Sequence, residues 1–364
     1  VTEAPCEADR VLLLRCDFLF ELRTLQSLLA FDSLLLMDDN GSQVAAALVP
    51  ADQAERVQQA MEREHDLNSA NPFPEAIPRA GRDALGTFDA RLRRAQWPML
   101  ERVTPENAHE LENTLYGNAY KGVTDLVTKW LWPRPAKGLV RLCAWLGLTP
   151  NMVTTLSFAL VIATGALFQA GALGWGLLLA WCMTLLDTVD GKLARVTVLA
   201  SRFGHYFDHL IDLIHPPFWY LLWAQGLVAT GQMAPDDLML LGGLIFGGYI
   251  GGRLAEAAFS KLCGGSLFTW RPFDSWFRLI TARRNPCLII LTLALLVQQP
   301  VAGIWGVTAW TLGTTVVLWL RVILALRERR RRGQLDSWLA REDAGEHHPR
   351  SYAVFSGTRG AYGR

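Results

Sequence analysis

Residues 187–212 read DTVDGKLARVTVLASRFGHYFDHLID. This stretch holds seven of the nine charged residues between Asn151 and Gly252, and the chain on either side of it is apolar. A soluble domain would not leave so long a span nearly free of charge, whereas a helix that crosses a bilayer needs about 20 predominantly apolar residues. We therefore interpret residues 187–212 as a charged island in a membrane domain. Because ionisable groups are costly in a bilayer, such an island marks the functional site.

Six apolar segments make up this membrane domain, and most are long enough to cross about 30 Å of hydrocarbon. They cover residues 151–170, 173–195, 204–229, 236–262, 284–299 and 301–326. The loops near 171–174, 229–237 and 298–303 contain no Lys or Arg, whereas the alternating loops are basic. The positive-inside rule therefore predicts that the basic loops and both termini face the cytoplasm. We expect an integral protein of a bacterial inner membrane.

Two features of these segments predict local geometry. Gly243, Gly247 and Gly251 have GxxxG spacing, which lets helices approach closely inside the bundle or across a homodimer. Pro216 and Pro217 lie inside the third segment and are expected to kink it.

The chain before the membrane domain has a different composition. Residues 1–150 hold 21 acids and 16 bases, and residues 151–364 hold 13 acids and 19 bases. The whole chain has a net charge of +1, which argues against a nucleic-acid partner because such proteins carry a basic excess. We expect residues 1–115 to form a small, non-catalytic, cytosolic α/β domain. Its expected elements are strands at Val11–Leu14, Ser33–Met37 and Val44–Val49, a turn at Asp39–Gly41, helices at Leu22–Ala30 and 52–65, and a further helix from about Phe88.

Residues 116–148 mix basic and aromatic side chains. The bases are Lys121, Lys129, Arg134, Lys137 and Arg141, and the aromatic residues include Trp130, Trp132 and Trp145. This mixture predicts an amphipathic helix in the membrane interface, in contact with lipid headgroups. An ordinary amphipathic helix on the soluble domain is the alternative. The six-helix domain then covers residues 149–332, and a polar tail covers 333–364.

The charged island places carboxylates on two neighbouring helices. Asp187 and Asp190 share a helix face, as do Asp208 and Asp212, because steps of three and four residues return to the same side. The intervening turn makes the two helices antiparallel. Four facing carboxylates would repel one another, and an all-oxygen set suits two Mg²⁺ or Mn²⁺ ions. Such a pair of ions could bridge a pyrophosphate.

The spacing DxxDGxxARx8GxxxDxxxD resembles the signature of the CDP-alcohol phosphotransferases, and every fixed position is matched between Asp187 and Asp212. The preceding Leu148–Thr154, LTPNMVT, also looks like the start of the family's first membrane helix. The resemblance covers roughly residues 120–330. It implies a six-helix membrane bundle, usually a homodimer, with its site open to the cytoplasm. The implied reaction is attack of an alcohol hydroxyl on the β-phosphorus of a CDP-alcohol, with release of CMP.

The resemblance also implies roles for individual residues. Asp187, Asp190 and Asp208 would hold the metals, and Asp212 would be a metal neighbour and the general base. The cytidine nucleotide would contact Gly191, Ala194 and Gly204, with Arg195 pairing with a phosphate or bracing a carboxylate. In family members with phosphorylated acceptors, basic residues near the cytoplasmic ends of the fourth and fifth helices bind the acceptor's phosphate. The candidates for that role here are Arg253, Arg283 and Arg284, although Arg253 and Glu256 would form an internal ion pair if they had no such function.

The donor we expect is CDP-diacylglycerol, and the acceptor is an inositol, a glycerol derivative or an amino alcohol. Three other functions stay open at this point: a Mg²⁺-dependent membrane prenyltransferase, a cation transporter and a non-catalytic scaffold. His205 and His209 lie beside the aspartates and are interpreted as hydrogen-bonding residues of the interface. The N-terminal domain resembles the nucleotidyltransferases fused to some relatives only at Arg15–Asp17. It lacks their glycine-rich nucleotide loop, which favours a structural or regulatory role.

Overall fold

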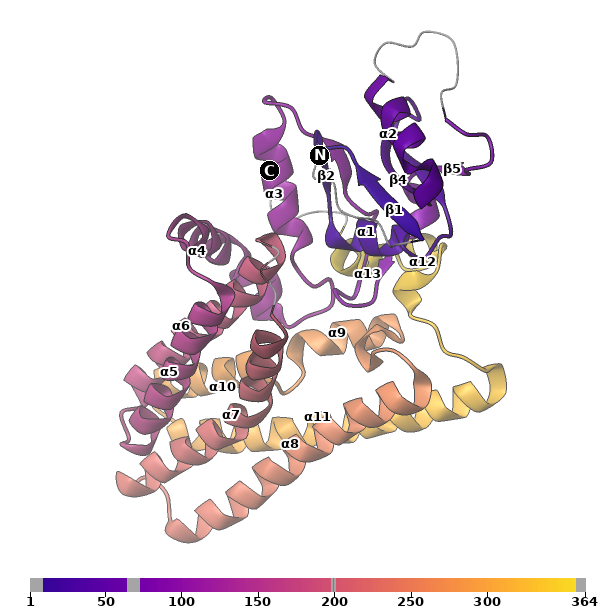
Figure 1. The fold of residues 1–364 in the computed structure, drawn as a ribbon. Coiled ribbons are helices and arrows are strands. Elements are labelled where there is room, and N and C mark those ends of the chain that lie inside the picture. Colours follow the sequence, from indigo (N-terminus) through magenta and orange to yellow (C-terminus); the bar gives the residue numbers. More distant parts are fainter. Residues whose placement is uncertain (1–8, 64–72, 198, 200, 358–364) are drawn as a thin grey trace. The chain divides into compact units, whose positions relative to one another are not determined.

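The chain divides into two compact units (Figure 1). The structure is a computed structural model that describes residues 9–63, 73–197, 199 and 201–357, without the side chains of Arg202, Phe203 and His205. The N-terminal unit comprises Val1–Asp89 and Ala95–Thr114. The membrane unit comprises Ala90–Arg94 and Leu115–Arg364. The structure is mostly helical, with a small α/β region at the N-terminus.

The N-terminal unit contains short strands and two helices. The strands are β1 (Arg10–Leu14), β2 (Phe18–Phe20), β3 (Leu34–Met37), β4 (Val44–Pro50), β5 (Arg79–Ala80), β6 (Phe88–Asp89), β7 (Arg94–Ala95) and β8 (Leu100–Arg102). The helices are α1 (Leu22–Leu28) and α2 (Ala54–Arg63), and α3 (Ala108–Asn118) follows them into the membrane unit.

A four-stranded sheet of order β1-β4-β3-β5 forms the centre of the N-terminal unit. Strand β4 pairs antiparallel with both β1 and β3, and β3 pairs parallel with β5. Alternate residues of β3 enter different cores, because successive side chains of a strand point to opposite faces. Leu35 packs in the core that includes α2, and Leu34 and Leu36 pack in the core that includes α1. The three strands expected from apolar runs are confirmed.

The helix expected from about Phe88 is wrong. Residues 88–102 form β6, β7 and β8, and the next helix begins only at Ala108. Pro98 cannot donate a helical hydrogen bond, and Arg93 has a φ of 51°, outside the right-handed helical region. Strands β6 and β7 pair with each other, and we call the turn between them, together with the first residue of β7, the hairpin tip Ala90–Arg94.

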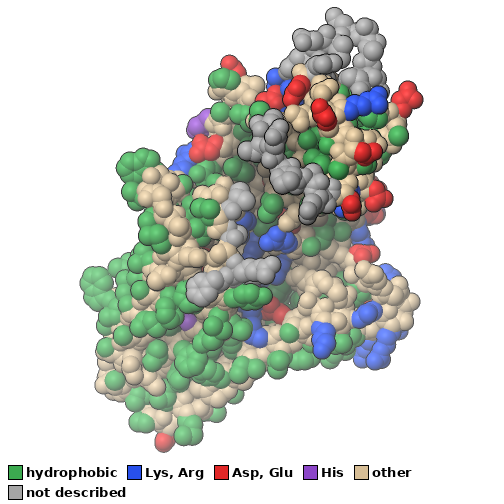
Figure 2. All heavy atoms as spheres, viewed as in Figure 1, with side chains coloured by type: hydrophobic (Ala, Val, Ile, Leu, Met, Phe, Trp, Pro, Cys, Tyr) green, Lys and Arg blue, Asp and Glu red, His purple; other side chains and the backbone are tan. Residues whose placement is uncertain are grey.

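The membrane unit is a bundle of long helices. Its main elements are α5 (Pro150–Gln169), α6 (Leu173–Val196), α7 (Arg202–Ala229), α8 (Pro235–Cys263), α9 (Pro272–Ile280), α10 (Arg284–Leu296) and α11 (Pro300–Arg332). In the described residues, α5, α6, α8 and α11 are long and apolar enough to span a membrane, and the bent pair of α9 and α10 is a possible fifth span. Large apolar side chains are exposed on these helices, and Figure 2 shows hydrophobic atoms spread over one face of the molecule.

The segment 116–148 is not one continuous helix. A π-helical turn at Val127–Leu131 is followed by α4 (Pro133–Trp145), which begins at a proline because Pro133 has no N–H to donate to the preceding turn. Helix α4 buries Ala136 and Val140 and leaves 81% of Trp145 exposed. The tail after α11 contains α12 (Ala344–His347) and α13 (Pro349–Phe355) and buries Trp338, Leu339 and Phe355.

Close packing of α8 against α11 depends on glycines. A Cβ atom on Gly248 or Gly251 would lie only 3.0–3.2 Å from side chains of α11. Thr315 of α11 donates to the carbonyl of Gly248 at 2.6 Å, and Trp319 donates to that of Gly251 at 3.1 Å. Gly243 and Gly247 have open space beside them. Of the expected GxxxG glycines, Gly251 therefore packs within the unit, and the other two remain on its surface.

Gly226 of α7 gives a test of the bundle. A Cβ atom there would lie 1.9 Å from the carbonyl oxygen of Phe168 in α5, so α5 and α7 must separate in Gly226→Ala. Overpacking of this kind costs about 1–3 kcal/mol, and we expect the midpoint of thermal unfolding in detergent to fall by several degrees. Gly313→Ala on α11, where nothing lies within 4 Å, is the matched control and should not lower it. Equal midpoints for the two variants would contradict this packing.

Candidate functional site

Three carboxylates from two helices converge in the membrane unit. Asp187 of α6 and Asp208 and Asp212 of α7 each present an oxygen within 4.8 Å of the others. Asp208 and Asp212 are one helical turn apart, so a single face of α7 presents both. Asp187 and Asp208 are partly buried, and Asp212 is the most exposed of the three.

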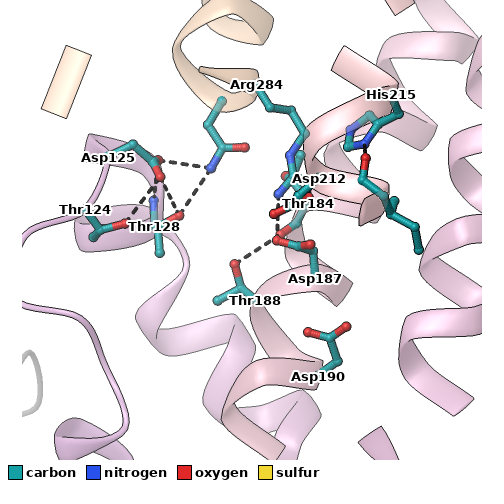
Figure 3. Close-up of polar contacts among 12 residues, drawn as sticks. Thr124, Asp125, Thr128, Thr184, Asp187, Thr188, Asp190, Asp212, His215 and Arg284 are labelled. Carbon is teal, nitrogen blue, oxygen red and sulfur yellow. Dashed lines mark hydrogen bonds and ion pairs between the residues drawn. The ribbon is translucent and has the colours of Figure 1, made fainter. Parts of the chain in front are cut away.

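Asp190 lies apart from this group. Its side chain is buried, and Thr154 of α5 donates to its Oδ2 at 2.6 Å. Figure 3 shows Asp190 one turn away from Asp187 on α6 and separate from Asp212. Thr154 belongs to the LTPNMVT segment, in which Thr149 caps the start of α5 and Pro150 is its first residue. The segment therefore begins the first long helix, as expected, and also holds one carboxylate of the motif.

Arg284 connects the two aspartate-bearing helices. From the first turn of α10, its Nη1 donates to Asp212 Oδ1 and its Nη2 donates to Asp187 Oδ2, each at 2.6 Å (Figure 3). The two N–H groups of one planar guanidinium thus bind two different carboxylates. One guanidinium balances only part of the charge of Asp187, Asp190, Asp208 and Asp212.

The donor chemistry of the three convergent carboxylates fits a hard divalent cation. Carboxylate oxygens without thiolate or imidazole are the ligands that Mg²⁺ and Mn²⁺ prefer. Asp187, Asp208 and Asp212 could hold such an ion, and it would supply the positive charge that Arg284 alone does not. Asp190 could join them only by turning away from Thr154.

The two prolines of α7 explain how Tyr249 is placed. Pro216 and Pro217 lack N–H groups, so the carbonyls of Asp212 and Leu213 have no helical donor. The Tyr249 hydroxyl of α8 donates to the Leu213 carbonyl at 3.0 Å and lies 3.4 Å from that of Asp212. Tyr249 therefore braces the backbone that carries Asp212. In the sequence, only the two prolines, which lack N–H groups, indicate that these carbonyls need a donor from another helix.

The expected nucleotide-contacting residues lie along the same two helices. A Cβ atom on Gly191 would lie 3.5 Å from the Arg195 guanidinium, so the Arg195 side chain folds back over Gly191 on α6. Ala194 is half-buried. A Cβ atom on Gly204 would lie 2.2 Å from Asn151 Oδ1, so the Asn151 side chain would have to move for any larger residue there. Ser201 caps this start, and its Oγ accepts from the Gly204 N–H.

A cavity of about 220 Å³ opens beside these residues. Its lining includes Asp187, Asp208, Asp212, Gly191, Arg195, Arg278, Arg283 and Arg284, together with Lys121, Asp125 and Thr128 of the segment before α4. The motif helices thus form one wall, and the segment 120–128 and the start of α10 form others.

Asp125 ties two of these walls together. Its carboxylate accepts from the backbone N–H groups of Val127 and Thr128 and from the Asn285 side chain of α10, at 3.0–3.1 Å (Figure 3). Burial raises the pKa of Asp125, but the charge of Arg278 and these hydrogen bonds outweigh burial and hold the pKa below its ordinary value. Neither Asp125 nor Asn285 is predicted from the sequence, because they are 160 residues apart and match no motif.

Two of the three candidate acceptor-binding arginines share one partner, and the third binds the motif aspartates. Arg253 pairs with Glu256 at 2.8 Å, which confirms the ion pair expected one turn along α8, and Arg283 also binds Glu256. Arg284 binds the aspartates instead. Arg283 and Arg284 line the cavity. His209 is exposed, and the side chain of His205 lies outside the described part of the chain.

Comparison with known proteins identifies the motif region. Residues 147–247 match the model of the CDP-alcohol phosphatidyltransferase family. This region of the chain is therefore similar to that family. The region contains all four motif aspartates and the start of α8. Enzymes of this family are CDP-alcohol phosphotransferases that generally use divalent metals, which agrees with the convergent carboxylates.

Several curated proteins resemble parts of the chain. A bifunctional IPC transferase and DIPP synthase of Rubrobacter xylanophilus is 30% identical over 193 residues, which is 50% of this chain and 38% of that protein. A phosphatidylinositol phosphate synthase of Mycobacterium bovis is 37% identical over 24% of this chain and 40% of its own. An archaetidylinositol phosphate synthase of Pyrococcus horikoshii is 34% identical over 22% and 42%. The chain spans less than half the length of each.

The Arg284 bridge predicts a metal-dependent stability. Arg284→Gln leaves Asp187 and Asp212 without their counter-ion, and breaking a fully buried pair costs about 3–5 kcal/mol, less here because 42% of the Asp212 side chain is exposed. We expect a lower thermal midpoint in chelator and a larger rise on adding Mn²⁺ than in the unchanged protein. Arg332→Gln, which breaks a surface pair, is the control. An Arg284→Gln midpoint that neither falls nor responds to Mn²⁺ would remove Arg284 from the site's charge balance.

Proposed function

We propose that this protein is an integral-membrane phosphotransferase that moves a phosphatidyl group from CDP-diacylglycerol to the hydroxyl of a small polar alcohol and releases CMP. The observation that carries the proposal is the convergence of Asp187, Asp208 and Asp212 beside a polar cavity, inside the region that matches the CDP-alcohol phosphatidyltransferase family. A prenyltransferase would also use carboxylates to bind Mg²⁺, but it would not require Gly191, Arg195 or the eight-residue gap between Arg195 and Gly204. The presence of these features therefore favours the phosphotransferase.

In this mechanism Asp212 takes the proton of the acceptor. The acceptor's hydroxyl oxygen forms a bond to the β-phosphorus of the donor, and the bond from that phosphorus to the bridging oxygen breaks, so CMP leaves with the electron pair. Asp212 suits the role of general base because its carboxylate is the most accessible of the three. Arg284 holds only its Oδ1, so Oδ2 remains available for the proton, and Tyr249 fixes the backbone behind it.

The remaining motif residues bind and orient the donor. Gly191 and Gly204 let the nucleotide approach the helix backbones, with Ala194 between them, and Arg195 pairs with a phosphate oxygen. Asp187, Asp190 and Asp208 would hold one or two Mg²⁺ or Mn²⁺ ions, with Asp212 beside them, and Asp190 would have to turn away from Thr154 to do so. When bound, the metals would neutralise charge that develops on the leaving phosphate.

We further propose that the acceptor is a phosphorylated polyol of the inositol phosphate class. The relatives in Mycobacterium bovis and Pyrococcus horikoshii are named phosphatidylinositol phosphate synthase and archaetidylinositol phosphate synthase. In this chain Arg283 lines the same cavity as Asp212, and both Arg283 and Arg253 bind Glu256. Guanidinium groups that could bind a phosphate are therefore present at the site.

Several wider features belong to the same proposal. The six spans are α5, α6, α7, α8, α9 with α10, and α11, with α4 in the interface and both termini in the cytoplasm of a bacterium. Exposed Gly243 and Gly247 on α8 would contact a second copy in a homodimer. The N-terminal unit would be non-catalytic, since it lacks the glycine-rich nucleotide loop.

The test is an assay of CMP release. Purified protein is incubated with CDP-diacylglycerol, Mg²⁺ and inositol, inositol phosphate, glycerol 3-phosphate or an amino alcohol, and the product is identified by mass. We expect CMP with the phosphorylated acceptor and none after chelation. Asp212→Asn should lower kcat by about 10²–10⁴-fold, the contribution of a general base, while the thermal midpoint shows that the variant folds.

Asp236→Asn changes an exposed acid in the first turn of α8 and is the control that should keep full activity. If Asp212→Asn turns over as fast as the unchanged protein, Asp212 is not the general base. Pyrophosphate release from a prenyl donor would favour a prenyltransferase, and metal flux into proteoliposomes without any response to cytidine nucleotides would favour a transporter.

A further inference from the structure

An arginine cluster surrounds one buried aromatic ring in the membrane unit. The guanidinium carbons of Arg93, Arg278 and Arg283 lie 6.0, 5.4 and 6.0 Å from the centroid of the Phe268 ring, and Phe268 is only 1% exposed. Three cations around one ring form an unusual concentration of positive charge. They come from three different segments of the chain, so the fold has to bring them together.

The cluster carries more positive than negative charge. Arg253 lies near both Arg93 and Arg278, Glu256 pairs with Arg253 and Arg283, and the charge of Asp125 acts on Arg278. Four guanidinium groups against two carboxylates leave an excess of two positive charges. Like charges held this closely repel one another unless an anion joins them.

Donor groups of the cluster are also unsatisfied. Among the described residues, the buried Nε and Nη1 atoms of Arg278 and the Nε of Arg283 have no hydrogen-bond partner. A buried N–H without an acceptor is costly, so each such group needs an acceptor. Arg278 and Arg283 both line the cavity that holds the carboxylates. A phosphate monoester would supply the oxygens that these donors lack.

Arg93 reaches the cluster from the hairpin tip Ala90–Arg94. The backbone N–H groups of Gly122 and Val123 donate to the carbonyls of Leu92 and Arg93 at 2.8 and 3.1 Å. Gly122 has no room for a side chain, since a Cβ atom would lie 2.6 Å from the Arg93 carbonyl oxygen and 2.3 Å from that of Phe355.

The tip holds Arg93 in a strained conformation. Its φ of 51° is rare for a residue other than glycine and persists only where surrounding contacts impose it. Burial and the neighbouring Arg278 lower the pKa of Arg93 to about 10, so its side chain still carries a positive charge at neutral pH.

We propose that the hairpin tip Ala90–Arg94 completes a phosphate-binding subsite by placing Arg93 beside Arg278 and Arg283. The subsite binds the phosphate of the acceptor, so this inference rests on the proposed function. Arg93 is then a specificity residue that a segment outside the family-matched region supplies. The donor's diphosphate has the same chemistry, but the donor-binding residues Gly191 and Arg195 lie on α6, outside this cluster.

The test compares substrate kinetics of Arg93→Gln with those of the unchanged full-length protein. We expect the KM for inositol phosphate to rise by about tenfold, the loss of one charge-assisted hydrogen bond, with the KM for CDP-diacylglycerol and kcat little changed. Arg93→Lys should recover part of the affinity. Gly122→Ala should act in the same direction, because it displaces the tip. Arg331→Gln, at the exposed end of α11, is the matched control.

Unchanged acceptor KM in Arg93→Gln, or a rise in the donor KM alone, would overturn the inference. Inorganic phosphate provides a second measurement that does not need turnover. It should raise the thermal midpoint of the unchanged protein and have a weaker effect on Arg93→Gln. If the unchanged protein releases no CMP, the proposed function fails, and this phosphate response alone decides the subsite. If phosphate raises the thermal midpoint of Arg93→Gln as much as that of the unchanged protein, the inferred phosphate subsite is wrong.

Discussion

The two ion pairs of Arg284 are the interaction on which the membrane unit's site depends. They join α10 to α6 and α7 at the point where the carboxylates of Asp187 and Asp212 would otherwise repel each other. Asn285, the next residue, binds Asp125 and so fixes the segment before α4 to the same helix start. A single helix terminus therefore sets the distance between the motif aspartates and the opposite wall of the cavity.

Carboxylates buried beside a bilayer also constrain the helices that carry them. Helix α7 has to keep Asp208 and Asp212 on one face and yet contains Pro216 and Pro217, which free two carbonyls. Tyr249 binds these carbonyls from α8, and α8 in turn approaches α11 closely at Gly248 and Gly251. The positions of the aspartates thus depend on packing between helices that carry no motif residue.

The sequence predicts those parts of the site whose residues lie close together in the chain. Spacing on two adjacent helices predicts that Asp187, Asp190, Asp208 and Asp212 face one another. Three of them converge, whereas Asp190 binds Thr154 instead. Apolar runs predict β1, β3 and β4. Hydrophobic pattern did not predict the strands after Phe88, because Pro98 and the left-handed Arg93 override it. Contacts such as Asp125 with Asn285 join positions far apart in the chain, and pattern alone contains no information about such pairs.

Gly122 shows why the N-terminal part of the chain matters to the membrane unit. A Cβ atom on Gly122 would collide with two backbone carbonyls, that of Arg93 in the hairpin tip and that of Phe355 at the end of α13, so only glycine lets the three backbone segments meet here. The contact holds the Arg93 side chain beside Phe268, whose ring also contacts the cavity-lining Arg278 and Arg283, although Arg93 precedes the family-matched region by more than 50 residues. If the proposed phosphate subsite is correct, a change in that hairpin alters which anions the cavity accepts and leaves the motif aspartates intact.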